Sequence, residues 1–189
     1  MTYSGSDGID WDEVLARVCF VEYNARKYWP AGEARGFTPW VRDHLDEIGA
    51  LLALNLQFVG FEAPVGAFRA DILARDDAGR TVLIENQFGP TDHQHLGKVV
   101  TYAEHAEVDV VVWIAAGSGP NIMTPIRDEH CETLRSLNKK FAGQTALCAI
   151  GVNLASDPGR RDVLPRMGLA VRPTEYPPPR NGIAEAHRS

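Results

Sequence analysis

Residues 66–88, GAFRADILARDDAGRTVLIENQF, have the pattern of a β-hairpin. Two runs rich in aliphatic and β-branched residues flank the sequence DDAG at residues 76–79, which has the Asp/Gly composition of a tight turn. Centring the turn on residues 77–79 places Asp71 opposite Glu85, or within one residue of it. Directly opposed side chains of a hairpin have Cβ atoms about 4.5–5.5 Å apart. The stretch therefore predicts two neighbouring strands whose carboxylates lie close together.

The two carboxylates predict a cation site. Carboxylates held this close in a half-buried sheet repel each other unless a positive charge lies between them. A divalent cation with oxygen ligands is the usual solution in proteins. The alternative is that Asp71 and Glu85 are solvated residues on an exposed sheet face. Acidic residues are disfavoured in strands, and both of these lie inside hydrophobic runs, which favours the metal site.

The composition indicates an ordinary folded chain. The 189 residues are 44% hydrophobic and 23% charged, which favours one domain with a core of its own. We expect no membrane partner, because no run approaches the roughly 18 apolar residues of a membrane span and no signal peptide opens the sequence. The cysteines, Cys19, Cys131 and Cys148, lack Cys-x-x-Cys spacing and favour buried thiols in a reducing cytoplasm. The net charge of −6 argues against a broad surface that coats nucleic acid, but permits a local basic groove.

Hydrophobic periodicity predicts the elements around the hairpin. Helices are expected over residues 10–28, 38–52, 91–106 and 124–140, and strands over residues 55–62, 109–116 and 145–154. Thr38 is the expected N-cap of the second helix, with Pro39 at its first position. Residues beyond 157 are Pro-rich and are expected to be irregular or disordered. This order predicts an α/β fold of three layers, with a central mixed sheet flanked by helices.

In this order of elements the chain resembles the PD-(D/E)XK nuclease superfamily, which has the restriction-endonuclease-like fold. Its core runs helix, three antiparallel strands, helix, strand, with an Asp at the end of the second strand and a Glu-x-Lys motif on the third. Asp71 and the Glu85-Asn86-Gln87 triplet fall at these places. The stretches ENQFGPTDHQHLGKVVTYA, VVWIAA and EHCETLRSLN resemble one bacterial branch of the superfamily.

The resemblance implies both domain organisation and activity. It divides the chain into an N-terminal helical extension (1–36), a nuclease-like core (37–155) and a Pro-rich C-terminal segment (156–189). The implied activity is metal-dependent hydrolysis of phosphodiester bonds with Mg²⁺ or Mn²⁺, in DNA rather than RNA. No helix-turn-helix, zinc finger or RNA-recognition signature reads a base sequence. The absence of a separate targeting domain leaves room for a homodimer or a partner subunit.

The superfamily pattern also implies a ligand set. Asp71 and Glu85 hold the metal, and a glutamate from the preceding helix completes its shell in many members. Glu47 matches that glutamate, and the backbone carbonyl of Asn86 adds a further oxygen. Glu47 lies at the edge of the apolar stripe of its helix, so the alternative is a rim residue without a ligand role.

One departure from the pattern concerns the catalytic charge. Gln87 stands where the superfamily has lysine; it can hydrogen-bond the attacking water but carries no charge. Lys98 on the following helix either replaces the missing charge or only binds phosphate, and a plain surface lysine is the alternative. Asp71, Glu85, Gln87 and Lys98 are thus the implied catalytic residues. The implied nucleic-acid contacts on the helix are His95, Lys98 and Tyr102.

Two other functions remain open. A zinc-dependent hydrolase would use His93 and His95, helped by Asp92 and His130. Side chains at positions i and i+2 of a helix diverge by about 200°, so joint ligation requires a loop. Alternatively, the uncharged Gln87 and the acidic net charge favour a non-catalytic binding or assembly subunit. Metal binding by the hairpin carboxylates distinguishes an enzyme from such a subunit.

Overall fold

The computed structural model of the chain describes residues 25–65, 68–117, 125–156 and 163–180. Its centre is a six-stranded sheet whose strands are neighbours in chain order. The strands are β1 (Leu56–Val65), β2 (Phe68–Asp76), β3 (Thr81–Phe88), β4 (Val110–Gly117), β5 (Ala146–Ser156) and β6 (Val163–Val171). The first three strands are antiparallel, β3, β4 and β5 are parallel, and β6 returns antiparallel to β5.

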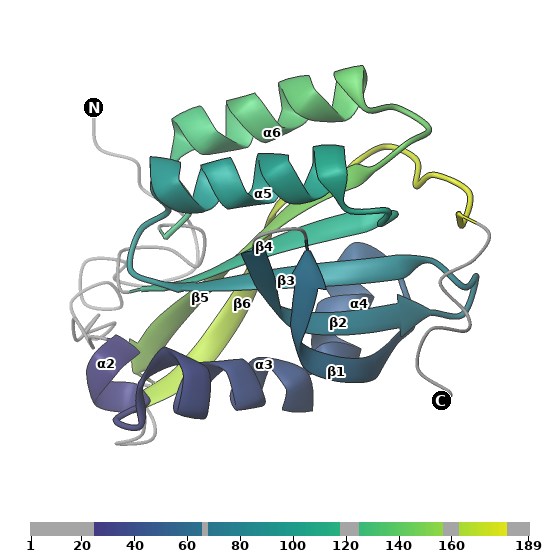
Figure 1. The fold of residues 1–189 in the computed structure, drawn as a ribbon. Helices are drawn as coiled ribbons and strands as arrows, with labels where there is room; N and C mark the ends of the chain where they lie inside the picture. The colour runs from purple at the N-terminus through teal and green to yellow at the C-terminus, as the bar shows by residue number, and fades with distance from the viewer. Residues whose placement is uncertain (1–24, 66–67, 118–124, 157–162, 181–189) are drawn as a thin grey trace, which may run out of the picture.

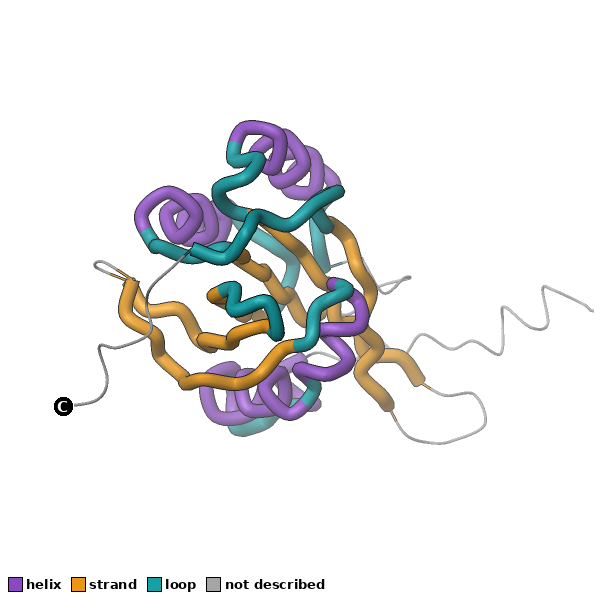
Figure 2. Tube along the Cα trace, turned by 90° about the vertical axis from the view of Figure 1, so that its right-hand side faces the viewer, coloured by secondary structure: helices purple, strands orange, loops and turns teal. Residues whose placement is uncertain are grey.

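The helices form two further layers, one on each face of this sheet (Figures 1 and 2). One layer consists of α5 (His93–His105) and α6 (Asp128–Lys140), which connect the parallel strands. The opposite layer consists of α2 (Ala25–Tyr28), η1 (Glu33–Phe37), α3 (Thr38–Asp43) and α4 (Leu45–Leu52). The predicted three-layer α/β fold with a mixed sheet is confirmed. Its order of helix, three antiparallel strands, helix and strand is the one that the resemblance implies.

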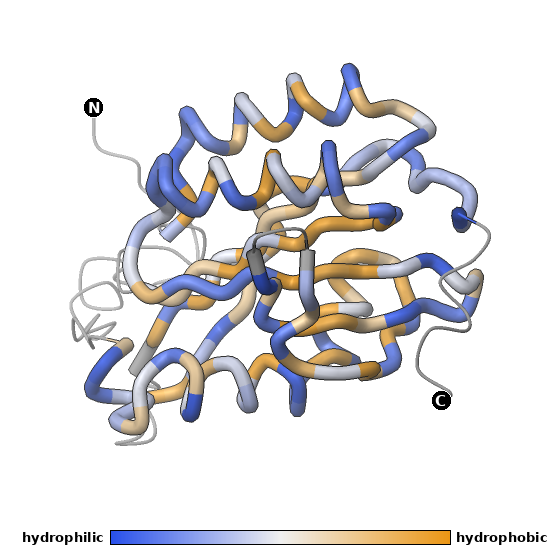
Figure 3. Tube along the Cα trace, viewed as in Figure 1, coloured by the Kyte–Doolittle hydropathy of each residue, from blue (hydrophilic) through white to orange (hydrophobic). Residues whose placement is uncertain are grey.

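Strand alternation explains how the sheet joins two cores. In β3, Val82 and Ile84 face the α3–α4 layer, whereas Leu83 faces α5. Every residue of β4 is buried because helices cover both of its faces, and hydrophobic residues run along most of its length (Figure 3). Apolar burial on both faces of the sheet therefore fixes the central strands that carry the candidate site.

The predicted hairpin is present in the predicted register. Gly79 has a φ of 87° in the turn, which favours glycine, and the Asp76 carboxylate accepts the Arg80 backbone N–H at 2.9 Å. The β2–β3 pairing runs from Arg75 opposite Thr81 to Ile72 opposite Ile84. The pairing ends at Ile72 and Ile84, one residue before Asp71 and Glu85.

The helical segment before the sheet differs from its prediction. Thr38 has helical backbone angles (φ −60°, ψ −45°), because η1 runs directly into α3, so it is not an N-cap. A break at His44 (φ −114°) separates α3 from α4. Trp29 and Phe37 belong to one core cluster with the sheet, so the boundary expected at residue 36 falls inside a single packed unit. The helix expected over residues 10–28 lies outside the described residues, apart from α2.

Residues 163–180 of the C-terminal segment pack against the rest of the described chain. β6 pairs with β5, and Pro165 is tolerated there because β6 is an edge strand. Beyond it, the Tyr176 hydroxyl donates to the Leu52 carbonyl at 2.8 Å. The backbone N–H of Arg180 donates to the Asp109 carboxylate at 2.9 Å. The expectation of an irregular tail is therefore wrong for residues 163–171, where the segment completes the sheet.

The structure bears on two expectations from the composition, one about the cysteines and one about membrane-spanning helices. Cys131 and Cys148 are buried and free, and Cys19 lies outside the described ranges. Within those ranges, no helix combines the length and the apolar character that crossing a membrane requires.

Asp109 provides a test of the C-terminal attachment. Its fully buried carboxylate accepts the N–H groups of Thr81 (2.7 Å) and Arg180 (2.9 Å). Asp109→Ala leaves both donors without their acceptor, so we expect a loss of about 2–4 kcal/mol in the free energy of unfolding, measured in urea. The control is Glu107→Ala, which removes an exposed carboxylate two residues away. Equal losses in the two variants would show that the attachment contributes nothing.

Candidate active site

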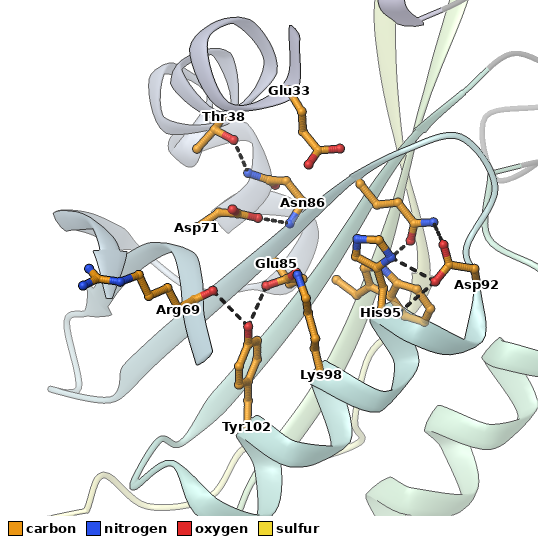
Figure 4. Close-up of polar contacts among 12 residues, drawn as sticks. Glu33, Thr38, Arg69, Asp71, Glu85, Asn86, Asp92, His95, Lys98 and Tyr102 are labelled. Atoms are coloured by element: carbon orange, nitrogen blue, oxygen red, sulfur yellow. Dashed lines mark hydrogen bonds and ion pairs between the residues drawn. The ribbon is translucent and has the colours of Figure 1, made fainter. Parts of the chain in front are cut away.

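Asp71 and Glu85 lie where β2 turns away from β3 (Figure 4). Ile72 packs on the α3–α4 side of the sheet, whereas Ala70 packs on the α5 side, so the strand alternation changes at Asp71. The Asp71 carboxylate then accepts the backbone N–H of Asn86 at 2.7 Å. Glu85 is 1% exposed and points toward α5. The change in strand direction thus brings two carboxylates close together where β2 and β3 separate.

Burial and the neighbouring carboxylates shift the pKa of Asp71. Burial raises its pKa to about 7; the charges of Glu85 and Glu33 add to this, and the Asn86 N–H partly offsets it. Near neutral pH, Asp71 therefore carries only part of its charge when no cation is present. A cation beside these carboxylates would restore the ionised form.

Lys98 supplies one positive charge from α5. Its Nζ lies 2.5 Å from Glu85 Oε1, and its side chain is 30% exposed. Burial alone would lower the pKa of Lys98, but the hydrogen bond and the charge of Glu85 outweigh it and raise the pKa. Lys98 is therefore an ammonium ion at the candidate site rather than a plain surface lysine.

Tyr102 has a different place from the one expected. Its side chain is fully buried, and its hydroxyl lies 3.0 Å from Glu85 Oε2 and 3.1 Å from the Arg69 carbonyl oxygen. Burial and the charge of Glu85 raise the pKa of Tyr102, so it remains a neutral donor. The expected contact with a nucleic-acid backbone is thus replaced by a contact that orients Glu85.

Gln87 is also committed to the protein interior. Its Nε2 donates to the Pro90 carbonyl (2.9 Å) and to Asp92 Oδ2 (2.8 Å), and its Oε1 accepts the Trp113 Nε1–H at 3.1 Å. Both amide protons are used and the side chain is 3% exposed. This corrects the expectation that Gln87 positions the attacking water: it ties β3 to the start of α5.

The helix glutamate near the site is Glu33 rather than Glu47. Glu47 is exposed in the first turn of α4. Glu33 Oε2 accepts the Phe88 N–H at 2.7 Å, and its charge contributes to the raised pKa of Asp71. Sequence reasoning missed Glu33 because it assigned residues 1–36 to an extension. Glu33 lies in a π-helical turn, a feature that often marks functional sites, but the sequence pattern does not predict one.

The oxygen atoms around Asp71 fit a hard cation. Asn86 is 1% exposed; its Nδ2 donates to Thr38 Oγ1 at 3.2 Å, and its buried Oδ1 finds no partner within the described ranges. A buried amide oxygen without a donor suits a cation that prefers carboxylate and carbonyl ligands. Among the described residues, no three Asp, Glu, His or Cys side chains converge on one metal position. A cation would therefore rest on two carboxylates and on neutral oxygens.

Comparison with known proteins gives remote likenesses. No protein-family model matches the sequence, and no curated protein is significantly similar to it. EndoMS in complex with double-stranded DNA is 14% identical over 53% of this chain and 39% of its own, with a TM-score of 0.40. A repair endonuclease from Pyrococcus abyssi is 13% identical over 61% of this chain and 45% of its own, with a TM-score of 0.39. Pyrococcus furiosus SfsA in complex with Ca²⁺ is 16% identical over 70% of this chain and 62% of its own, with a TM-score of 0.43. The matched regions thus span less than two thirds of these neighbours, and TM-scores below 0.5 carry neither fold nor function to this chain.

The histidines do not form the zinc site that was considered. His93 Nδ1 lies 3.0 Å from His130 Nε2, and His130 Nδ1 lies 2.7 Å from Thr91 Oγ1. His95 instead lies 2.9 Å from an Asp92 oxygen. His93 and His95 thus diverge into separate hydrogen-bonded pairs, as their spacing on α5 requires.

The raised pKa of Asp71 predicts a pH-dependent stability. An aspartate has a pKa of about 3.9 in the unfolded chain, so the metal-free native state binds this proton more tightly. Its contribution to the free energy of unfolding is complete below about pH 4 and is lost as the pH rises through 7. Asp71→Asn has no such titrating group and does not suffer this loss. With metal removed by EDTA, the free energy of unfolding of the variant should therefore rise by on the order of 2–4 kcal/mol relative to the wild type between pH 4 and pH 8.

Urea unfolding at several pH values measures this difference. The exposed Glu132 of α6 provides the control, because Glu132→Gln should follow the wild-type curve at every pH. An unchanged difference between wild type and Asp71→Asn from pH 4 to pH 8 would show that the native state does not raise the pKa of Asp71.

Proposed function

We propose that this protein is a metal-dependent nuclease that hydrolyses phosphodiester bonds, with DNA as its substrate. The proposal is carried by the position of Lys98, whose Nζ lies 2.5 Å from Glu85 Oε1. The lysine charge that the Glu-x-Lys pattern provides from a strand here comes from α5. A strand carboxylate, a second carboxylate opposite it and one ammonium group together form the set that phosphodiester hydrolysis requires.

The carboxylates of Asp71 and Glu85, with an oxygen of Asn86, would hold Mg²⁺ or Mn²⁺, and Glu33 is a further carboxylate whose charge acts on Asp71. When bound, the cation supplies a water of lowered pKa and neutralises charge on the phosphoryl group. Glu47 has no part in this set, because its side chain faces solvent.

The protein's own groups hold the site in position. The Asn86 N–H fixes one oxygen of Asp71, and the Tyr102 hydroxyl fixes one oxygen of Glu85. The Lys98 ammonium group is partly exposed and can contact a phosphoryl oxygen while it remains at Glu85. Groups that are oriented before the substrate arrives do not have to reorganise during the reaction, which is the main source of electrostatic catalysis.

A non-catalytic DNA-binding subunit is the second candidate. One observation favours it: Gln87 occupies the motif lysine position with both of its amide protons bound internally. Such a protein would bind DNA without cutting it, and metal would not change its affinity. Cleavage assays separate the two functions.

The purified chain is incubated with linear, circular and single-stranded DNA and with RNA, in Mg²⁺ or Mn²⁺. We expect metal-dependent cleavage of DNA that is abolished in Asp71→Asn and in Glu85→Gln. Lys98→Met should lower the rate by about 10²–10³-fold, because the charge it provides is lost. The control is Lys139→Met, which removes an exposed charge on α6 and should leave the rate unchanged.

Failure to cut any substrate with either metal, together with metal-independent binding to DNA, would establish the binding subunit instead. Cleavage that survives in both Asp71→Asn and Glu85→Gln would place the active site elsewhere.

A further inference from the structure

Two hydrogen-bonded links join β3 to α5. Glu85 accepts from Lys98 (2.5 Å), and Gln87 donates to Asp92 (2.8 Å). Glu85 and Gln87 are two positions apart on β3, so they lie on the same face of the sheet and are separated by about 6.6 Å along the strand. On the helix, Asp92 and Lys98 lie on either side of His95, at three residues from it in each direction. His95 is therefore held between the two links, next to the candidate site (Figure 4).

The imidazole of His95 is oriented through one nitrogen. Its Nδ1 lies 2.9 Å from Asp92 Oδ1, and its side chain is 19% exposed. With a carboxylate at Nδ1, the proton of the neutral ring resides there and Nε2 carries the lone pair. No partner for Nε2 is present in the described part of the chain. The nitrogen that can accept a proton is thus the one left open.

Asp92 is itself fixed from the sheet. Gln87 holds its Oδ2 at 2.8 Å, and the Trp113 indole N–H holds Gln87 at 3.1 Å. Burial alone would raise the pKa of Asp92, but the backbone N–H and imidazole of His95 outweigh it and lower the pKa. An ionised carboxylate in a fixed position is what keeps an imidazole in one tautomer and stabilises its protonated form.

We propose that His95 is the catalytic base of this nuclease and that Asp92 and Gln87 are its positioning residues. The inference rests on the proposed function and assigns its proton transfer. His95 Nε2 takes a proton from the attacking water as the water oxygen bonds to phosphorus and the bond from phosphorus to the leaving sugar oxygen breaks. The leaving oxygen takes a proton from solvent, and the imidazolium later returns its proton to solvent.

This assignment explains the glutamine at the motif position. A lysine at residue 87 has donors but no acceptor, so it would leave the Trp113 indole N–H without its partner and would place a charge in a site that is 3% exposed. Glutamine accepts from Trp113 and donates to Asp92 at once. The motif charge comes from Lys98 instead, which frees residue 87 to support the Asp92–His95 pair.

A purely structural role is the competing explanation, because Asp92 is also the N-cap of α5 and accepts the His95 backbone N–H at 2.8 Å. Asp92 is bonded to His95, Gln87 on β3 is bonded to Asp92, and the Lys98–Glu85 pair lies one turn further along α5. A structural role would affect folding but would not affect the pH dependence of the rate. The test therefore measures that dependence.

Single-turnover cleavage is measured against pH at saturating Mg²⁺ and at saturating Mn²⁺, in wild type, His95→Gln and His95→Ala. In the wild type, the rate should rise once with pH, and the position of that rise should not move between the two metals, because the proton is lost from the protein and not from a metal-bound water. His95→Gln should lose about 10²–10³-fold in rate together with this rise. Added imidazole should partly restore His95→Ala. The control is His105→Gln, an exposed histidine on the same helix, with wild-type rate and profile.

Two further measurements cover the positioning residues. Nitrogen NMR of the metal-free protein should show His95 protonated at Nδ1, and Asp92→Asn should lose that preference. Gln87→Lys, which restores the superfamily motif, should lower the cleavage rate. A higher rate in Gln87→Lys would overturn the inference.

The outcomes separate this inference from the proposed function. Wild-type cleavage with an unchanged rate and pH profile in His95→Gln would overturn the role of His95 and leave the nuclease intact. Absence of cleavage by the wild type in either metal would overturn both.

Discussion

Repulsion between the carboxylates of Asp71 and Glu85 is the constraint on which the rest of the site depends. Burial of the site adds to it: burial first, and then the charge of Glu85, raise the pKa of Asp71 to about 7. Each neighbouring group offsets part of it: the Asn86 N–H, the Lys98 ammonium and the Tyr102 hydroxyl all point at a carboxylate oxygen. Two buried carboxylates that raise each other's cost of ionisation destabilise the metal-free fold, as the raised pKa of Asp71 indicates. The presence of both acids at this cost is the physical reason to propose that the site is functional.

The features that were predicted correctly from sequence depend on local patterns. Period-2 alternation and the Asp/Gly turn specify the hairpin, whose paired register ends one residue before Asp71 and Glu85. Continuous apolar character specifies β4, buried on both faces. β6 was missed because Pro165 and Gly168 interrupt its pattern, although both are tolerated on an edge strand.

The roles of single site residues depend on partners far away in the chain, which the sequence does not reveal. The Gln87 side-chain oxygen accepts a hydrogen bond from Trp113, 26 residues later in the chain. The Tyr102 hydroxyl donates to the carbonyl oxygen of Arg69, 33 residues earlier. Glu33 reaches Phe88 across 55 residues from a segment that was assigned to an extension. Burial explains two of these roles: Gln87 and Tyr102 are enclosed and position the site, while the partly exposed Lys98 and His95 remain able to contact a substrate.

Mn²⁺ binding, followed by electron paramagnetic resonance of the protein without nucleic acid, tests the need for a cation most directly. Protons compete with the metal for Asp71, so the wild type should bind Mn²⁺ at pH 8 and release it as the pH falls to 6. Asp71→Asn should bind far more weakly at both pH values. If the wild type binds no Mn²⁺ at pH 8, or if Asp71→Asn binds it equally well, the two carboxylates do not form a metal site.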